Sequence, residues 1–455
     1  MRRLASGNVL VQELTQIGSR DACVANRGNT GDHMTTRLTK SILLIALALL
    51  MLFEPVTMAQ PQSGLLLGDD PRVADAGFSV TRFADGLNFP SGLAILPDGS
   101  LLVATSRPDG GRYYDSVGEL IRLVDADADG VADGPGEVLA TGLPGELTSL
   151  AIAGDLVAVT SAQWDRESIH FLQLGDAGGY SLTWLGHLGF DFGDVLHQSY
   201  GLAFQPGPDD DGAFTLAFSV GSFGDIEAGP PVGVNGLVGG SVLPAAIYSV
   251  ALTLSGGALT AAQPELIATG VRNAMAMGFD TEGNLWIADN DINGSTAVDY
   301  PKSADWLGTI PAVDIGGEPE EFGYPDTFTV YPTGERIGDR DIEPVLDFLP
   351  LDGSESIGAS SLVSAPAGFP DGLNNGVLVG FHGLFDGAGL ENATNPLLFV
   401  DLETHERFEL IANASPGIGH LNSLATSTSA LYAADLCNGS FLTSTPCGTI
   451  WRIGA

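Results

Sequence analysis

Apolar and small residues alternate with a period of two in six similar segments of the chain. Each segment holds a small polar residue, an apolar run, a turn that in most copies contains Gly with Asp or Asn, and a second apolar run. The six segments open at Ser91, Thr148, Ser199, Asn273, Ser360 and Asn422. Such a repeat predicts paired strands in sheet units that bury their faces only against neighbouring units.

Six sheet units of this kind predict an all-β fold, a six-bladed β-propeller. We expect the last strand, 448–453, to share a blade with the first strand, 78–83, so that the two terminal strands close the ring and hide the sheet edges. Residues 60–455 then form a single domain. The residues that precede the first strand of each copy would surround one channel opening, where we expect the functional groups to lie.

The N-terminal part of the chain has the layout of an export signal. Residues 42–53 are twelve consecutive apolar residues, preceded by Arg37 and Lys40 and followed by small residues. This pattern predicts a signal peptide at 34–59 and interprets 1–33 as a mis-called N-terminal extension. The apolar run is too short for a stable membrane anchor, although an uncleaved signal anchor is the alternative. We therefore expect an exported protein, either periplasmic or secreted.

Two cysteines, Cys437 and Cys447, lie close together near the C-terminus. In an oxidising compartment this spacing favours a single disulfide that closes a surface loop. Two free thiols are the alternative.

The charge balance narrows the choice of partners. Lys and Arg number 18 against 56 Asp and Glu, which gives a formal net charge of −38. Nucleic acids and anionic membrane surfaces are bound through Lys and Arg, so both are disfavoured. We expect a small-molecule substrate, and no pattern in the sequence indicates an oligomeric state.

Two short motifs precede inner strands and carry candidate chemistry. His197 and Gln198 stand before the third strand pair, and an imidazole there could accept a proton from a substrate hydroxyl near neutral pH. A histidine that only hydrogen-bonds neighbouring loops is the alternative.

Arg272 and Asn273 stand before the fourth strand pair. An arginine kept at a channel mouth in so acidic a chain favours an anionic group of a ligand, which a guanidinium can hold through two hydrogen bonds. The alternative is a pair with a local carboxylate such as Asp289 or Asp291.

The segment 125–133 resembles the first half of an EF-hand calcium loop. It has carboxylates at positions 1, 3 and 5, a glycine at position 6 and a backbone carbonyl at position 7, followed by an aspartate at position 9. The predicted Ca²⁺ ligands are Asp125, Asp127, Asp129, the carbonyl of Val131, and Asp133. Ca²⁺ would clamp a loop between blades, whereas an acidic solvated turn is the alternative.

The order of several motifs resembles the glucose/sorbosone dehydrogenase family, which are six-bladed quinoprotein propellers. The matching pieces are Gly-Leu-Asn-Phe-Pro at 86–90, His-Gln-Ser at 197–199, Gly-Val-Arg-Asn at 270–273, Phe-Gly-Tyr-Pro at 322–325, Phe-Pro at 369–370 and His-Gly at 382–383. The resemblance implies an oxidoreductase that uses pyrroloquinoline quinone and Ca²⁺ and acts on a sugar or another alcohol.

The same resemblance assigns roles to individual residues. His197 would be the general base that takes the hydroxyl proton while a hydride passes to the quinone, and the cofactor would be bound by Gln198, Arg272, Asn273 and His382. The family also grips the quinone with basic residues from the last two blades, and here 354–451 contains only Arg407. Two alternatives therefore stay open, a non-catalytic Ca²⁺-stabilised propeller that binds a ligand or partner, and a metal-dependent hydrolase similar to lactonases.

Overall fold

A computed structural model shows two compact units, Met1–Pro61 and Gln62–Ala455. All the described residues belong to the second unit: 65–108, 116–163, 166–175, 179–192, 197, 201–207, 212–294, 301–340, 342–350, 358–383, 397–412, 421–436 and 446–454. The predicted leader segments, Gln198 and Cys437 lie outside these residues. Within them, no helix has the length and apolar character needed to cross a membrane.

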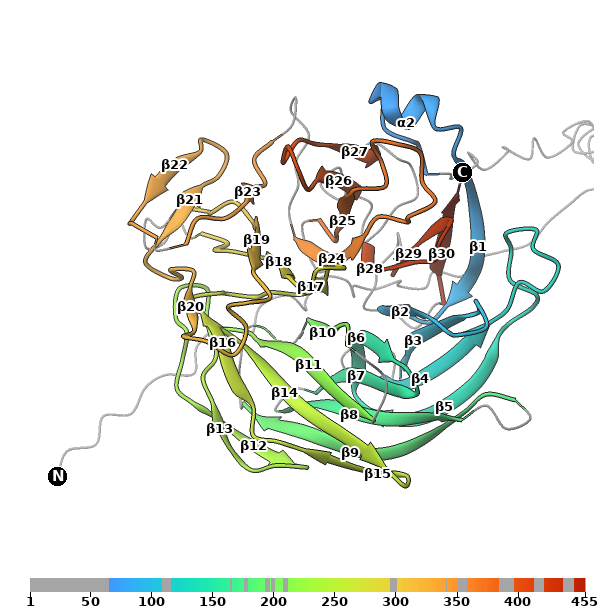
Figure 1. Ribbon diagram of the computed structural model, residues 1–455, viewed down its shortest axis with the longest axis horizontal. Coiled ribbons are helices and arrows are strands. Elements are labelled where there is room, and N and C mark those ends of the chain that lie inside the picture. The colour runs from blue at the N-terminus through green and yellow to red at the C-terminus, as the bar shows by residue number, and fades with distance from the viewer. Residues whose placement is uncertain are drawn as a thin grey trace, which may run out of the picture. The chain divides into compact units, whose positions relative to one another are not determined.

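The second unit is almost entirely β-structure, arranged as the six blades of a propeller (Figure 1). Blade 1 contains β2 (Gly92–Ile95), β3 (Leu101–Pro108), β4 (Ser116–Leu123) and β5 (Glu137–Pro144). Blade 2 contains β6 (Glu146–Ala153), β7 (Leu156–Gln163), β8 (Arg166–Gly175), β9 (Ser181–Asp191), β12 (Val232–Gly236) and β13 (Gly240–Val242). Blade 3 contains β10 (Leu202–Phe204), β11 (Ala213–Val220), β14 (Ala246–Ser255), β15 (Ala258–Ala261), β16 (Glu265–Thr269) and β20 (Glu320–Glu321).

The other three blades have four strands each. Blade 4 contains β17 (Ala276–Phe279), β18 (Leu285–Asp289), β19 (Trp306–Ile310) and β23 (Leu346–Asp347). Blade 5 contains β24 (Ala359–Ser364), β25 (Gly376–Phe381), β26 (Leu397–Asp401) and β27 (Arg407–Ile411). Blade 6 contains β28 (Leu421–Thr426), β29 (Ala430–Asp435), β30 (Gly448–Gly454) and β1 (Ser79–Leu87). A hairpin of β21 (Phe328–Val330) and β22 (Glu335–Ile337) and the short helix α2 (Pro71–Asp75) lie outside the blades.

The predicted repeat is confirmed strand by strand. The innermost strands β2, β6, β10, β17, β24 and β28 are the first strands of the six copies, and each contacts the innermost strand of the next blade. The first and last strands pair as expected, with Val80 opposite Ile453 and Arg82 opposite Trp451. Blade 6 is therefore built from both ends of this unit.

The hydrophobic core lies in layers between neighbouring blades, and the period-two pattern decides which layer each residue enters. In β7, Val157 and Val159 pack in the layer between blades 1 and 2, whereas Ala158 packs in the layer between blades 2 and 3. All three residues are fully buried. Because both faces of such a strand are covered, its small and apolar residues alternate between two cores rather than between core and solvent.

The small polar residues of the repeat connect neighbouring blades. Ser91 is 1% exposed, and its Oγ donates to the carbonyl of Leu147 in blade 2 at 2.5 Å. Ser360 likewise donates from blade 5 to the carbonyl of Leu421 in blade 6. These buried hydroxyls satisfy backbone carbonyls at the seam between two blades, where no sheet partner is available.

Replacing Ser91 with alanine should therefore destabilise the fold by about 1–3 kcal/mol, because the Leu147 carbonyl loses a buried donor. Urea unfolding measures this change. Ser181→Ala, at an exposed serine of β9, is the matched control and should stay within about 0.5 kcal/mol of the wild type. Equal stability of the two variants would contradict a role for the seam hydroxyl.

Candidate functional site

A cavity of about 340 Å³ lies among the innermost strands of all six blades. Its lining residues fall in 93–95, 148–152, 202–204, 275–279, 360–364 and 422–426. Three of the predicted site residues precede two of these strands, whereas His382 follows β25 and the 125–133 segment follows β4. His197 stands before β10, and Arg272 and Asn273 stand before β17.

His197 is held by the segment that follows β11. Its Nδ1 lies 2.9 Å from Ser222 Oγ and 3.2 Å from the Ser222 carbonyl, while Ser222 Oγ donates to the carbonyl of Gly224 at 2.7 Å. A hydroxyl has one hydrogen, so Ser222 Oγ accepts from His197. This network assigns the imidazole proton to Nδ1 and leaves the lone pair on Nε2, which is the basic nitrogen.

The surroundings of His197 favour its neutral form. Burial lowers the pKa of His197 well below its ordinary value of 6.5, and the positive charge of Arg272 lowers it further. The contact with the Ser222 backbone acts in the opposite direction but is the smallest of the three effects. Near pH 7, His197 is therefore a neutral imidazole that can accept a proton.

His197 fits beside β11 because the residue next to it is glycine. A Cβ on Gly221 would lie 2.7 Å from His197 Cβ and 3.6 Å from Asn273 Oδ1. Asn273 is 6% exposed, and its Oδ1 has no hydrogen-bond partner among the described residues. Gly221 thus brings His197 and an unsatisfied amide oxygen to the same small region.

The guanidinium of Arg272 is buried and bonded within the protein. Its Nη2 donates to Asp225 Oδ1 at 2.8 Å, its Nε to the Asp225 carbonyl at 3.2 Å, and its Nη1 to the Asn290 carbonyl at 2.9 Å. The side chain is 2% exposed. The carboxylate partner of the guanidinium is Asp225, whereas Asp289 accepts the backbone N–H of Arg272 and Asp291 accepts the backbone N–H of Ile292.

Asp289 binds the backbone in front of β17. Its two carboxylate oxygens accept the N–H groups of Arg272 at 2.9 Å and Asn273 at 2.7 Å. Burial raises the pKa of Asp289 to about 6, against the effect of these two hydrogen bonds and the charge of Arg272.

Asp305 makes the same kind of contact with the next blade. Its Oδ2 accepts the N–H groups of Gly358 at 2.6 Å and Ala359 at 3.3 Å, where β24 begins, and its Oδ1 accepts from Asp291 N at 3.1 Å. Burial raises the pKa of Asp305. Burial and the charge of Asp289 raise the pKa of Asp291 well above its ordinary value.

His382 lies one blade further along and contacts this network through Gly358. Its N–H donates to the Gly358 carbonyl at 2.8 Å, and a Cβ on Gly358 would meet the His382 ring at 2.5–2.7 Å. The structure thus places His382 with the backbone that Asp305 holds, and no described contact joins it to His197.

Sequence reasoning missed Ser222, Asp225 and Asp305. Ser222 and Asp225 directly follow the second strand of blade 3, just as Asp291 follows the second strand of blade 4. This shared position after the second strand of a blade could have identified Ser222 and Asp225 from the sequence. Asp305 stands at the start of a third strand and carried no signal in the repeat.

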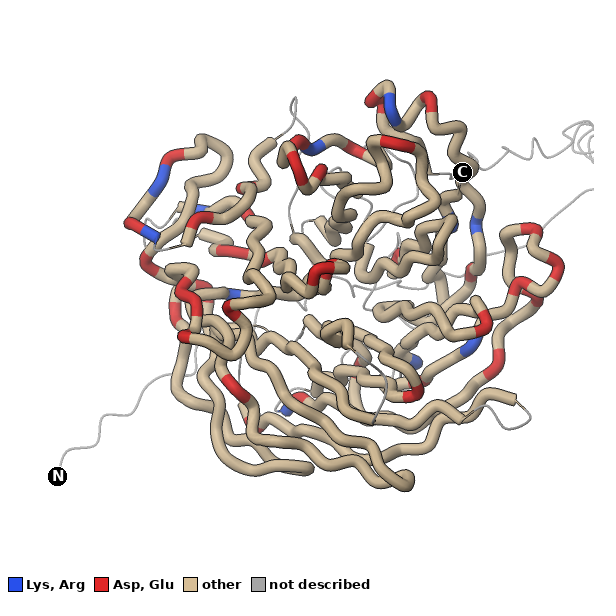
Figure 2. Tube along the Cα trace, in the orientation of Figure 1, with Lys and Arg blue, Asp and Glu red and all other residues tan. Residues whose placement is uncertain are grey.

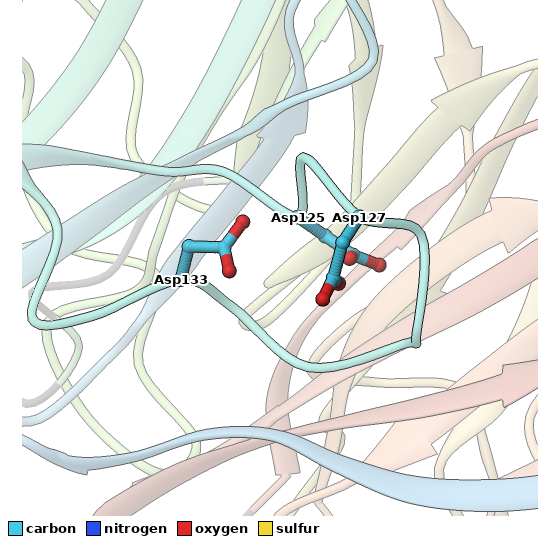
Figure 3. Close-up of side chains that lie close together, drawn as sticks. All are labelled: Asp125, Asp127 and Asp133. Atoms are coloured by element: carbon cyan, nitrogen blue, oxygen red, sulfur yellow. The ribbon is translucent and has the colours of Figure 1, made fainter.

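The calcium loop predicted at 125–133 brings three of its carboxylates together (Figure 3). Oxygens of Asp125, Asp127 and Asp133 lie within 4.8 Å of one another. Asp125 Oδ2 accepts the N–H of Gly130 at 2.9 Å, whereas Asp129 Oδ1 accepts the N–H of Val131 at 2.8 Å. Asp129 therefore caps its own turn and is not part of the three-carboxylate group.

Basic residues are few and scattered among many acidic ones (Figure 2). Arg407 donates to two backbone carbonyls, Arg336 forms an ion pair with Glu343, and Arg340 is buried 4.0 Å from Asp291 Oδ2. These three arginines are therefore bonded within the protein or buried beside a carboxylate.

Comparison with known proteins gives similarity in structure alone. No protein-family model and no curated protein sequence matches the chain. The PQQ domain of pyranose dehydrogenase from Coprinopsis cinerea is 14% identical, with a TM-score of 0.56 over 87% of this chain and 98% of that one. A Trichoderma reesei carbohydrate-active enzyme of family AA12 is 14% identical, with a TM-score of 0.53 over 86% and 97%. The PQQ-bound aldose sugar dehydrogenase from Streptomyces coelicolor is 16% identical, with a TM-score of 0.50 over 83% and 99%.

The raised pKa of Asp289 predicts a specific dependence of stability on pH. Below about pH 4, the pKa range of an unfolded aspartate, its contribution to the free energy of unfolding is fully present, and it is lost as the pH rises through about 6. Asp289→Asn removes this titration. The free energy of unfolding should then fall less between about pH 4 and 6.5 than in the wild type, by up to about 3 kcal/mol.

Urea unfolding at a series of pH values measures the two slopes. Asp314→Asn, at an exposed carboxylate, is the matched control and should keep the wild-type slope. Identical slopes for Asp289→Asn and the wild type would contradict the assignment.

Proposed function

We propose that this chain is an exported oxidoreductase that acts on a sugar or a related alcohol bound at the channel mouth. His197 accepts the hydroxyl proton of the substrate at Nε2. The observation that carries the proposal is the fixed, neutral imidazole of His197, with Nδ1 bonded to Ser222. The pyranose and aldose sugar dehydrogenases of the same fold support the substrate class. Export and a disulfide between Cys437 and Cys447 are predictions from the sequence that accompany this proposal.

Pyrroloquinoline quinone, which is named with those two proteins, places demands on the residues that would bind it. When bound, pyrroloquinoline quinone would supply a hydride acceptor, and its three carboxylates need cationic partners. Three of the five guanidinium N–H groups of Arg272 are bonded to Asp225 and the Asn290 carbonyl in a side chain that is 2% exposed, and Arg407 is bonded to two carbonyls. Among the described residues, Arg272 and Arg407 therefore do not fit the carboxylates of the quinone, and the proposed oxidation needs another two-electron acceptor, such as the dye of the assay below, to take the hydride of the substrate.

A ligand-binding propeller without catalysis is the second candidate, and the engagement of Arg272 favours it. It differs from the first candidate in the role of His197. A binding protein needs no proton acceptor at this position, so loss of the Nε2 base would leave its ligand affinity and its function unchanged.

Replacing His197 with asparagine should remove the base and keep a donor near Ser222. Dye-coupled oxidation of an aldose panel should then fall by about 100- to 10,000-fold. Because the pKa of His197 lies well below 6.5, wild-type kcat/KM should be flat from that pH upward and fall only at lower pH, as the base is protonated.

His405→Asn, in an exposed turn, is the control and should retain wild-type activity. The panel is run alone and with pyrroloquinoline quinone and Ca²⁺, with optical titration of the quinone. Absence of oxidation in every arm, or unchanged activity of His197→Asn, would overturn the proposal.

We also propose that the 125–133 loop binds Ca²⁺. The three carboxylates of Asp125, Asp127 and Asp133 support it, because their oxygens converge there and Ca²⁺ prefers hard oxygen ligands. The Gly130 carbonyl accepts from Thr81 Oγ1 of β1 at 3.2 Å, so an ion would tighten a loop that touches blade 6.

Ca²⁺ should therefore raise the Tm, and a chelator should lower it, by an amount that grows with the logarithm of the free ion concentration. Differential scanning calorimetry measures the shift. Asp127→Asn should abolish most of it, whereas Asp75→Asn, at an exposed aspartate of α2, should preserve it. A Tm that does not change when Ca²⁺ is added at millimolar concentration would exclude the site.

A further inference from the structure

A groove of about 620 Å³ lies between blade 1 and blade 2, on the side of the outer strands. β5 of blade 1 forms one wall, and β8 and β9 of blade 2 form the other. None of its lining residues also lines the channel cavity. The groove is therefore separate from the site around His197.

Three aromatic rings form a row along the blade 2 wall. The rings of His170 and His187, directly opposite each other on β8 and β9, have centroids 6.0 Å apart. The Trp184 ring follows at 6.2 Å from His187, tilted by 29°. Trp184 and His187 share a face because a register shift occurs between Phe171 and Leu172 on the opposite strand.

The row runs from a buried ring to an exposed one. His170 is 6% exposed and Trp184 is 56% exposed, which makes Trp184 one of the most exposed large apolar side chains among the described residues. The apolar surface of an indole in a groove is unfavourably exposed to water, and a ligand that covers it would remove that surface from water. The exposed indole is thus the natural contact face for an apolar surface of a ligand.

Polar groups flank the rings. Asn235 Nδ2 donates to Asp191 Oδ2 at 3.2 Å at one end of the groove. His170 Nε2 lies 2.9 Å from Ser161 Oγ, while its Nδ1 has no hydrogen-bond partner among the described residues. The lining of the groove therefore combines aromatic faces with many hydrogen-bonding side chains.

Charge disfavours an anionic ligand. The described lining residues include Glu167 and Asp191 but only one basic residue, Arg166, in a chain of net charge −38. An anionic ligand would be repelled by this field. A pyranose ring has an apolar C–H face for the indole and hydroxyl groups at its edge for an amide, a carboxylate and an imidazole.

We propose that this groove binds the pyranose units of a neutral oligosaccharide, with Trp184 as the stacking platform. The site is independent of the proposed chemistry at His197. The groove would bind a longer carbohydrate on the outer side of blade 2, whether or not His197 takes part in a reaction at the channel.

Isothermal titration of the full chain with cellohexaose, xylohexaose and mannohexaose tests the proposal. At least one of these neutral hexaoses should bind with a Kd below about 1 mM. Trp184→Ala should weaken binding at least 10-fold, whereas Trp184→Phe should stay within about threefold because it keeps an aromatic face. Both variants should keep the wild-type Tm, since the side chain is largely exposed.

Two controls separate this groove from other surfaces. Val313→Ala, at the most exposed of the large apolar residues, should leave the Kd unchanged, and so should His405→Asn, in an exposed turn. Failure of all three hexaoses to bind would overturn the proposal. Binding that survives Trp184→Ala but is lost in His197→Asn would also overturn it, because the sugar would then occupy the channel.

Discussion

Buried carboxylates that accept backbone N–H groups hold the channel mouth together. Asp289 binds the amides of Arg272 and Asn273 before β17, and Asp305 binds the amides in front of β24 in the next blade. Innermost strands begin where sheet pairing ends, so these amides have no strand partner and need an acceptor. The position of Arg272, and through it the electrostatics of His197, follows from this anchoring.

The anchoring of the backbone by Asp289 also explains the role of Arg272, one of the few arginines in a very acidic chain. The charges near the channel mouth neutralise one another locally, because Arg272 pairs with Asp225 and lies beside the carboxylate of Asp289. Because the Arg272 side chain is 2% exposed and bonded within the protein, it presents little of its guanidinium to a ligand anion. Its field still acts on His197, where it opposes protonation and preserves a basic nitrogen. The cation thus serves the site through its charge rather than through a direct contact with a ligand.

The sequence alone predicted the six strand pairs, the shared blade of β1 and β30, and the convergence of His197 with Arg272, because the repeat period and the buried strand pattern are local properties. Contacts made after a strand ends were not predictable. Whether Arg272 pairs with Asp225 or with Asp289 depends on how two blades approach each other, and spacing along the chain carries no information about that.

Blade 2 shows a further arrangement that local patterns cannot predict. β12 and β13 come from the chain between β11 and β14 of blade 3, yet β12 pairs with β9 of blade 2, with Asn235 opposite Gly189. A Cβ on Gly189 would lie 2.5 Å from Asn235 Oδ1, so the missing side chain is what lets the amide lie across β9 toward Asp191. The added strands cover the edge of β9 and supply one polar end of the outer groove. Strands inserted in the blade 3 part of the chain thus complete the outer groove on blade 2. This groove is separate from the channel that the repeated innermost strands form.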